Sequence, residues 1–123
     1  MSMIENKLIL VVDDDQVILN ILRIKLKLSG FNVVTVSNGR EALALIGSAQ
    51  PDVMLLDVLM PGIDGFEVLK RLRNFSELPV IVFSARPEYA QKAVSSGAND
   101  FLAKPFDIDD VVKRIKRLIA QNS

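Results

Sequence analysis

Polar side chains that could carry chemistry follow four of the five short apolar runs in this 123-residue chain. In chain order they are Asp13, Asp14 and Asp15 after residues 8–12, Asp57 after 53–56, Ser84 after 80–83, and Lys104 after 101–103. Carboxylates that converge in a small pocket raise one another's pKa unless a cation lies among them. An all-oxygen set suits Mg²⁺, which also coordinates phosphate oxygens, and a carboxylate can attack phosphorus to give an aspartyl phosphate. If these side chains meet, they can support magnesium-assisted phosphoryl transfer.

Each of these residues also has an ordinary structural interpretation. Aspartates that follow strands commonly form turns and cap helices, and Asp15 fits that role. A single Ser84 would more often be a cap, and a single Lys104 a solvated charge. Asp57 is different, because four apolar residues precede it and residues 58–60 are apolar too. A carboxylate in such surroundings is partly buried and needs a partner. Taken together, the set favours a functional site.

Composition excludes several classes of function. Half of the chain is apolar, so one domain over residues 1–123 can build a hydrophobic core. Fifteen basic and fifteen acidic residues leave no net charge, so neither direct nucleic-acid binding nor binding to an anionic membrane is expected. Cysteine and histidine are absent, which excludes disulfides, thiolate or imidazole metal sites and serine–histidine catalysis. We expect a cytoplasmic protein, because neither a secretory signal nor a membrane span is visible.

The apolar runs alternate with stretches that have helical periodicity. The runs at 8–12, 32–36, 53–56, 80–83 and 101–103 are typical of strands buried in a parallel sheet, with 32–36 at an edge. Capping patterns at Asn38 and Asp64, Pro87 as a first helical residue, and the acidic start at Asp107 predict helices between and after them. Residues 15–29 form the remaining helix. The chain is therefore predicted to be an α/β three-layer sandwich with five strands and five helices.

Four motifs together resemble the receiver domain of bacterial two-component response regulators. They are Val11-Val-Asp-Asp-Asp15, Leu55-Leu-Asp-Val-Leu-Met-Pro-Gly-Ile-Asp-Gly65, Phe83-Ser-Ala85 and Lys104-Pro-Phe106, and the resemblance covers residues 7–121. It implies a flavodoxin-like receiver fold, with a five-stranded parallel sheet of order 2-1-3-4-5.

The resemblance also implies a metal site and a phosphoacceptor. Asp57 matches the residue that accepts the phosphoryl group. Asp14 and Asp57 would ligate Mg²⁺ directly, Asp13 would do so mainly through water, and the backbone carbonyl of Leu59 would complete the protein ligands.

A second group of positions corresponds to the family's switch. Ser84 occupies its serine/threonine position, and Phe101 occupies its aromatic position, which is often a tyrosine. Lys104 would bind the phosphoryl group, and the peptide bond before Pro105 would be cis. The stretch 86–97 is shorter than usual in the family, which questions dimerisation in the manner of DNA-binding regulators. Leu59 and Arg86 stand at positions that tune phosphate lifetime.

The function implied is a signalling switch and not a metabolic enzyme. Because the chain lacks histidine, the phosphoryl donor must be a separate histidine kinase or phosphotransfer protein, and the response must reach a downstream protein target or output domain. Self-phosphorylation from phosphodonors and slow autodephosphorylation would be its only catalysis. Docking on the kinase would use the helix over 15–29, where Leu19 and Ile24 exceed the needs of one buried stripe. A more extensive core contact would explain the same two residues equally well.

Three alternatives belong to other functional classes. A receiver-like interaction module that never binds phosphate would not need the complete set of acids, hydroxyl and lysine. An aspartyl-phosphate phosphohydrolase could use Asp13 and Asp15, but Asp57 would then be unexplained. A flavin- or nucleotide-binding protein would need a phosphate loop rich in glycine, serine or threonine after the first strand, where three aspartates stand instead.

Overall fold

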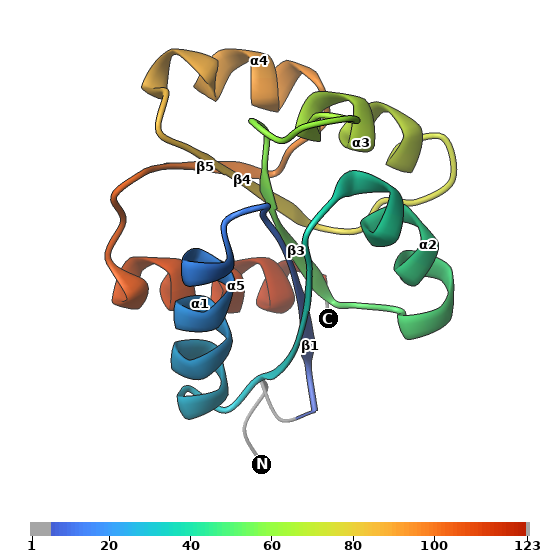
Figure 1. Ribbon diagram of the computed structural model, residues 1–123. Coiled ribbons are helices and arrows are strands. Elements are labelled where there is room, and N and C mark those ends of the chain that lie inside the picture. The colour runs from blue at the N-terminus through green and yellow to red at the C-terminus, as the bar shows by residue number, and fades with distance from the viewer. Residues whose placement is uncertain (1–5, 123) are drawn as a thin grey trace.

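Five parallel strands form one sheet in the order β2-β1-β3-β4-β5 in the computed structural model, which describes residues 6–122 (Figure 1). The strands are β1 (Leu8–Val12), β2 (Asn32–Val36), β3 (Val53–Asp57), β4 (Val80–Ser84) and β5 (Asp100–Ala103). The helices are α1 (Gln16–Leu28), α2 (Gly39–Ala49), α3 (Gly65–Leu72), α4 (Ala90–Ser95) and α5 (Ile108–Gln121), with a 3₁₀ turn, η1 (Pro87–Tyr89), directly before α4. The predicted fold class and strand order are confirmed.

Three of the five apolar runs form the central strands β1, β3 and β4. Every residue of β3 and β4 is buried, whereas β2 lies at an edge of the sheet and is mostly half-exposed. Alternate strand residues face two separate cores: Leu10 and Met54 pack with α2, α3 and α4, while Ile9 and Leu55 pack with α1 and α5. Figure 1 shows these two groups of helices on opposite faces of the sheet. Burial on both faces explains why these strands are apolar throughout instead of alternating.

The sheet register brings the carboxyl ends of the strands together. Val12 pairs with Leu56, so the residues that follow them, Asp13 and Asp57, leave the sheet side by side. On the other side of β3, Asp57 pairs with Phe83, the residue before Ser84. Ser84 in turn pairs with Ala103, the residue before Lys104. All the polar residues expected at this edge therefore reach it.

Side-chain caps start four of the helices. Asp15, Asn38, Asp64 and Asp107 each accept a hydrogen bond from a backbone N–H in the first turn of α1, α2, α3 and α5. At α2 the cap is reciprocal in part, because the Asn38 amide also donates to the Glu41 carboxylate. The predicted starts at Asn38, Asp64 and Asp107 are confirmed. None of the helices within residues 6–122 is both long and apolar enough to cross a bilayer.

Of the two interpretations of Leu19, the role in docking is wrong and the core contact is correct. Leu19 is only 2 % exposed and packs with Leu22 and Leu26 in the core beneath α1 and α5. The helix packs against both the sheet and the neighbouring helix α5, so its buried face is wider than one narrow stripe. The exposed apolar residues are instead Val17, Ile21, Ile24 and Leu28, which recur at intervals of four, three and four along one face.

The segment between β4 and β5 contains little regular helix. Pro87 begins the 3₁₀ turn η1 and not an α-helix, and the α4 helix that follows has six residues. Arg86 precedes η1 without a side-chain cap. The α-helical part of this connection is therefore short.

Candidate functional site

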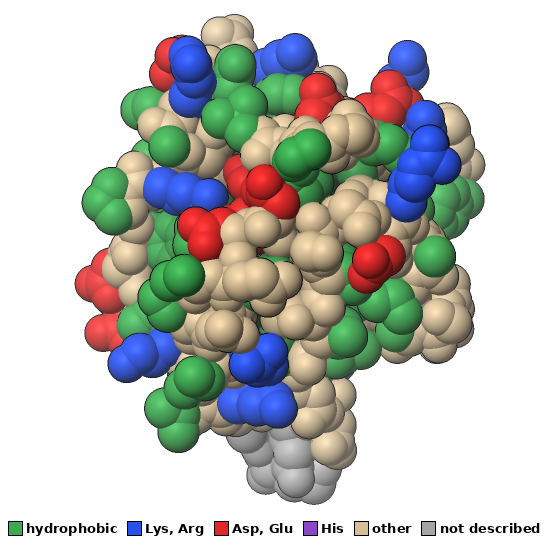
Figure 2. Space-filling view, viewed as in Figure 1, with side chains coloured by type: hydrophobic (Ala, Val, Ile, Leu, Met, Phe, Trp, Pro, Cys, Tyr) green, Lys and Arg blue, Asp and Glu red, His purple; other side chains and the backbone are tan. Residues whose placement is uncertain are grey.

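Three aspartates converge where β1 and β3 end. Carboxylate oxygens of Asp13, Asp14 and Asp57 lie within 4.8 Å of one another. Asp13 is completely buried and Asp57 is 4 % exposed, whereas Asp14 is exposed. Figure 2 shows acidic side chains gathered over this edge of the sheet, with a basic side chain beside them. The cluster has one solvent-facing side, through which a cation and a phosphodonor can approach.

Lys104 supplies the positive charge of the site. Its Nζ lies 3.1 Å from Asp13 Oδ2 and 3.6 Å from Asp57 Oδ2. The same ammonium lies 4.8 Å from the centre of the Phe83 ring, so a cation–π contact also holds it. Its backbone N–H donates to Ser84 O at 2.8 Å, and the Lys104–Pro105 peptide bond is cis. The lysine is thus fixed between the two buried carboxylates and the end of β4.

The environment of Asp57 favours its protonated form. Burial, together with the charge of Asp13, raises the pKa of Asp57 from 3.8 to about 6. Lys104 opposes this rise by its charge, and the Leu59 N–H opposes it by donating to Asp57 Oδ1 at 3.3 Å. A divalent cation among the three carboxylates would favour the ionised form, which is the form that can attack phosphorus. The donor set consists only of oxygens and therefore fits Mg²⁺.

The loop after Asp57 returns closely to the strand that it leaves. Gly65 N–H donates to Val58 O, and a Cβ at Gly65 would lie 2.6 Å from the backbone oxygen of Asp57. Gly62 has a φ of +78°, which a glycine adopts without strain. These two glycines let α3 begin directly against the end of β3. Leu59, at the outer side of this loop, is 45 % exposed.

The proposed switch residues lie on the neighbouring strands. Ser84 is completely buried, and its Oγ accepts a hydrogen bond from the Arg86 N–H at 3.1 Å. Phe101 on β5 is half-buried and packs against the core on the α3 and α4 side of the sheet. In this conformation the serine hydroxyl is therefore engaged with the start of the β4–α4 connection.

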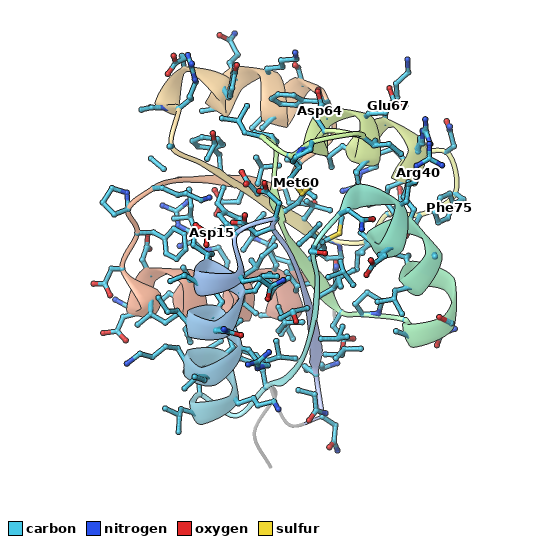
Figure 3. All side chains as sticks on the ribbon, viewed as in Figure 1. Asp15, Arg40, Met60, Asp64, Glu67 and Phe75 are labelled. Atoms are coloured by element: carbon cyan, nitrogen blue, oxygen red, sulfur yellow. The ribbon has the colours of Figure 1, made fainter. Side chains whose placement is uncertain are left out.

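Asp15 does not join the cluster. Its carboxylate caps α1 by accepting from Val17 N–H, and its own N–H donates to Asp13 Oδ1. Figure 3 labels Asp15 at the beginning of α1. A phosphohydrolase that used Asp13 and Asp15 as a pair would need Asp15 free, so this alternative gains no support from the structure.

Sequence reasoning missed two exposed residues near the site. Val17 and Ile21 lie on the first half of α1, and Ile21 lines an apolar depression of about 400 Å³ with Ala85, Pro105 and Phe106. The helical periodicity of α1 could have revealed them, because a buried face centred on Leu22 leaves Val17 and Ile21 outside it. This depression also has Lys104 in its wall, so it adjoins the acidic cluster.

Comparisons with known proteins agree with this geometry. Residues 9–116 match the family model of the response regulator receiver domain. Response regulator MprA of Mycolicibacterium vanbaalenii and transcriptional regulatory protein KdpE of Mycobacterium tuberculosis are each 40 % identical over 118 residues, which cover 94 % of this chain. The chain spans about half the length of these relatives, 51 % and 52 % respectively.

Solved structures show the same similarity. The receiver domain of Francisella response regulator 1452 superimposes with a TM-score of 0.90 at 36 % identity, and covers 96 % of this chain and 100 % of that one. The response regulator TrrA of Thermotoga maritima, solved in complex with Mg²⁺-BeF, gives a TM-score of 0.84 at 34 % identity and covers 91 % and 98 %.

Proposed function

Because this chain belongs to the response regulator receiver domain family of two-component signalling, we propose that Asp57 accepts a phosphoryl group from a partner histidine kinase or phosphotransfer protein. The phosphorus–nitrogen bond of the donor histidine breaks as a phosphorus–oxygen bond to the Asp57 carboxylate forms, and the electron pair returns to the imidazole. The chain acts in the cytoplasm as one receiver unit. Its resemblance to receiver domains covers residues 7–121. Its catalysis is limited to phosphorylation by phosphodonors and slow autodephosphorylation.

Mg²⁺ is the cofactor that the acidic cluster would hold. Asp14 and Asp57 would bind it directly, Asp13 would bind it mainly through water, and the carbonyl of Leu59 would complete the protein ligands. The convergence of the three carboxylates supports this assignment. When bound, Mg²⁺ neutralises charge on the phosphoryl oxygens. Asp57 would then stay ionised at neutral pH, because the cation would offset the charge of Asp13.

Lys104 and Ser84 act on the phosphoryl group once it is attached. Lys104 already bridges Asp13 and Asp57, so a small movement brings its ammonium to a phosphoryl oxygen. Ser84 donates its hydroxyl to another oxygen and Phe101 then moves toward the space that is freed. The free energy of one such hydrogen bond is about 0.5–1.5 kcal/mol, so it biases an existing equilibrium between two conformations.

The exposed face of α1 is the docking surface for the donor. Val17, Ile21, Ile24 and Leu28 form an apolar stripe whose first half borders the depression beside Lys104. α1 carries Lys25 and Lys27 in its last turn and has no acidic residue in its first turn. An amphipathic helix of the partner with acidic flanks fits this surface. The response passes to a downstream protein target or output domain.

The contact of Lys104 with both buried carboxylates is the observation that carries this proposal. Acetyl phosphate with Mg²⁺ should add the mass of one phosphoryl group to the intact protein, and excess EDTA should prevent the addition. An unchanged mass in Mg²⁺ under conditions that label a known receiver would contradict the proposal. That result would favour an interaction module that never binds phosphate.

A further inference from the structure

One aromatic ring joins α3 to the segment that contains η1 and α4. The ring of Tyr89 in η1 meets the Phe66 ring edge to face, with centroids 5.5 Å apart and planes at 88°. Lys92 Nζ of α4 lies 4.3 Å from the centroid of the same ring. We call Phe66, Tyr89 and Lys92 the Phe66 clasp. The Phe66 ring therefore makes two electrostatically favourable contacts. Its face meets the Lys92 ammonium, and it packs at right angles to the Tyr89 ring.

A different kind of contact holds the other end of α4. The guanidinium of Arg73, just after α3, donates twice to Gly97 O, at 3.0 and 2.8 Å, and once to Asn99 Oδ1 at 3.1 Å. Between the two attachments a groove of about 550 Å³ lies along α3 and α4, lined by Asp64, Phe66, Glu67, Lys70, Arg73, Ser95 and Ser96. The two helices lie near each other in Figure 1. Hydrogen bonds from the Arg73 side chain thus hold the segment at the C-terminal end of α4, while the clasp holds the N-terminal part.

Both sides of the clasp connect to the phosphorylation site. The Ser84 hydroxyl accepts from Arg86 N–H, and Tyr89 N–H donates to Arg86 O, so two successive hydrogen bonds link Ser84 to Tyr89. On the other side, Gly65 N–H donates to Val58 O, which places Phe66 directly after the junction of α3 with the strand that carries Asp57. A rotation of the Ser84 hydroxyl toward Asp57 would release the Arg86 N–H and weaken the first link.

We propose that the Phe66 clasp stabilises the unphosphorylated conformation and is released when Ser84 turns toward a phosphoryl group on Asp57. This inference rests on the proposed function, because it names how the same site is regulated. A contact made in only one of two conformations lowers the affinity of any ligand that prefers the other. The clasp therefore restrains the switch, and weakening it should tighten the binding of a phosphoryl mimic at Asp57.

The chain offers its own reporter for this contact. Tyr89 is its single tyrosine and there is no tryptophan, so tyrosine fluorescence reports on the clasp alone. Beryllofluoride would be titrated at saturating Mg²⁺ while Tyr89 emission is followed, and ¹⁹F NMR would count the bound mimic independently. The variants are Phe66→Leu, which keeps an apolar side chain without a ring, and Lys92→Gln, which removes the cation alone. Phe75→Leu is the matched control, because Phe75 is exposed beyond the end of α3.

We expect Tyr89 emission to change in wild type and the apparent affinity for beryllofluoride to rise about two- to tenfold in Phe66→Leu. Lys92→Gln should give a rise of about two- to fivefold, and Phe75→Leu should match wild type. Constant Tyr89 emission while ¹⁹F NMR shows bound mimic would overturn the inference but leave the proposed function intact. Wild-type affinity in both clasp variants would do the same. Absence of bound mimic in wild type would overturn both.

Discussion

Lys104 Nζ lies 3.1 Å from Asp13 Oδ2, closer than the 3.6 Å that separates it from Asp57 Oδ2. Asp13 is completely buried, so this ion pair has little solvent to replace it if the lysine is lost. Within residues 6–122, Lys104 is the only basic side chain that forms an ion pair with either buried carboxylate. It therefore has a structural role in addition to the one proposed toward phosphate.

Lys104→Met should consequently lower the stability of the metal-free protein at pH 7. Removing one partner of a buried pair costs about 3–5 kcal/mol, and the partial exposure of Lys104 reduces this to about 1–3 kcal/mol. Urea unfolding in EDTA would measure the loss, and millimolar Mg²⁺ should recover part of it. The matched control is Lys113→Met, since Lys113 is exposed on α5. Equal unfolding midpoints for the two variants in EDTA would refute this role.

The raised pKa of Asp57 predicts how stability depends on pH. With a folded-state pKa of about 6 and an ordinary value of 3.8, the folded protein binds more protons between these pH values. The free energy of unfolding should therefore fall as pH rises from about 4 to 6, and Asp57 should cause no further change above that range. Asp57→Asn should raise the free energy of unfolding in EDTA at pH 7.5 by about 1–3 kcal/mol, and by much less at pH 4. Thermal unfolding at both pH values tests this, and a benefit that is equal at the two would contradict it.

Two glycines offer opposite predictions for the same substitution. A Cβ at Gly65 would lie 2.6 Å from Asp57 O and from Val58 Cα, so Gly65→Ala should destabilise the protein by about 1–3 kcal/mol. Nothing lies within 4 Å of a Cβ at Gly47 in α2, so Gly47→Ala should stabilise it by about 0.5–1 kcal/mol. Chemical denaturation of both variants is the measurement. Destabilisation by Gly47→Ala would contradict the open space at this position of α2.

The exposed stripe on α1 predicts that a substitution there impairs only phosphotransfer from the partner kinase. Ile21→Glu should slow phosphotransfer from a histidine kinase that labels the wild type, because Ile21 is half-exposed beside Lys104. Labelling by acetyl phosphate should stay at the wild-type rate, since the pocket itself is unchanged. Leu19→Glu is the informative contrast, because it buries a charge in the core and should reduce folding and both reactions together. Equal loss of both reactions in Ile21→Glu would remove the docking assignment.

The strands and the chemical edge of the sheet could be predicted from sequence because both depend on local patterns. The central strands are apolar throughout since both of their faces are covered, and Asp13 and Asp57 each stand at the carboxyl end of such a strand. That the two strands are neighbours in the sheet was implied only by the family resemblance. Capping residues such as Asn38 and Asp64 act within one helical turn, so their signals are local as well.

Features that depend on tertiary packing could not be predicted in this way. Leu19 is buried because α1 packs against both the sheet and its neighbour α5, which a single helical stripe does not reveal. The contact of Phe66 with Tyr89 joins segments of different helices, and neither residue has a distinctive sequence neighbourhood. The weak helical character after β4 was indicated only by the short stretch 86–97, while Pro87 alone suggested an α-helix.

The most direct test of the central claim compares wild type with Asp57→Asn. Both proteins would be incubated with Mg²⁺ and a small phosphodonor such as acetyl phosphate, and their intact masses would be measured over time. Asparagine keeps the shape of the side chain but has no carboxylate nucleophile, so the wild type should gain the mass of one phosphoryl group and the variant should gain none. Labelling of Asp57→Asn at the wild-type rate would contradict the account and direct attention to Asp13 or Asp14 as the acceptor.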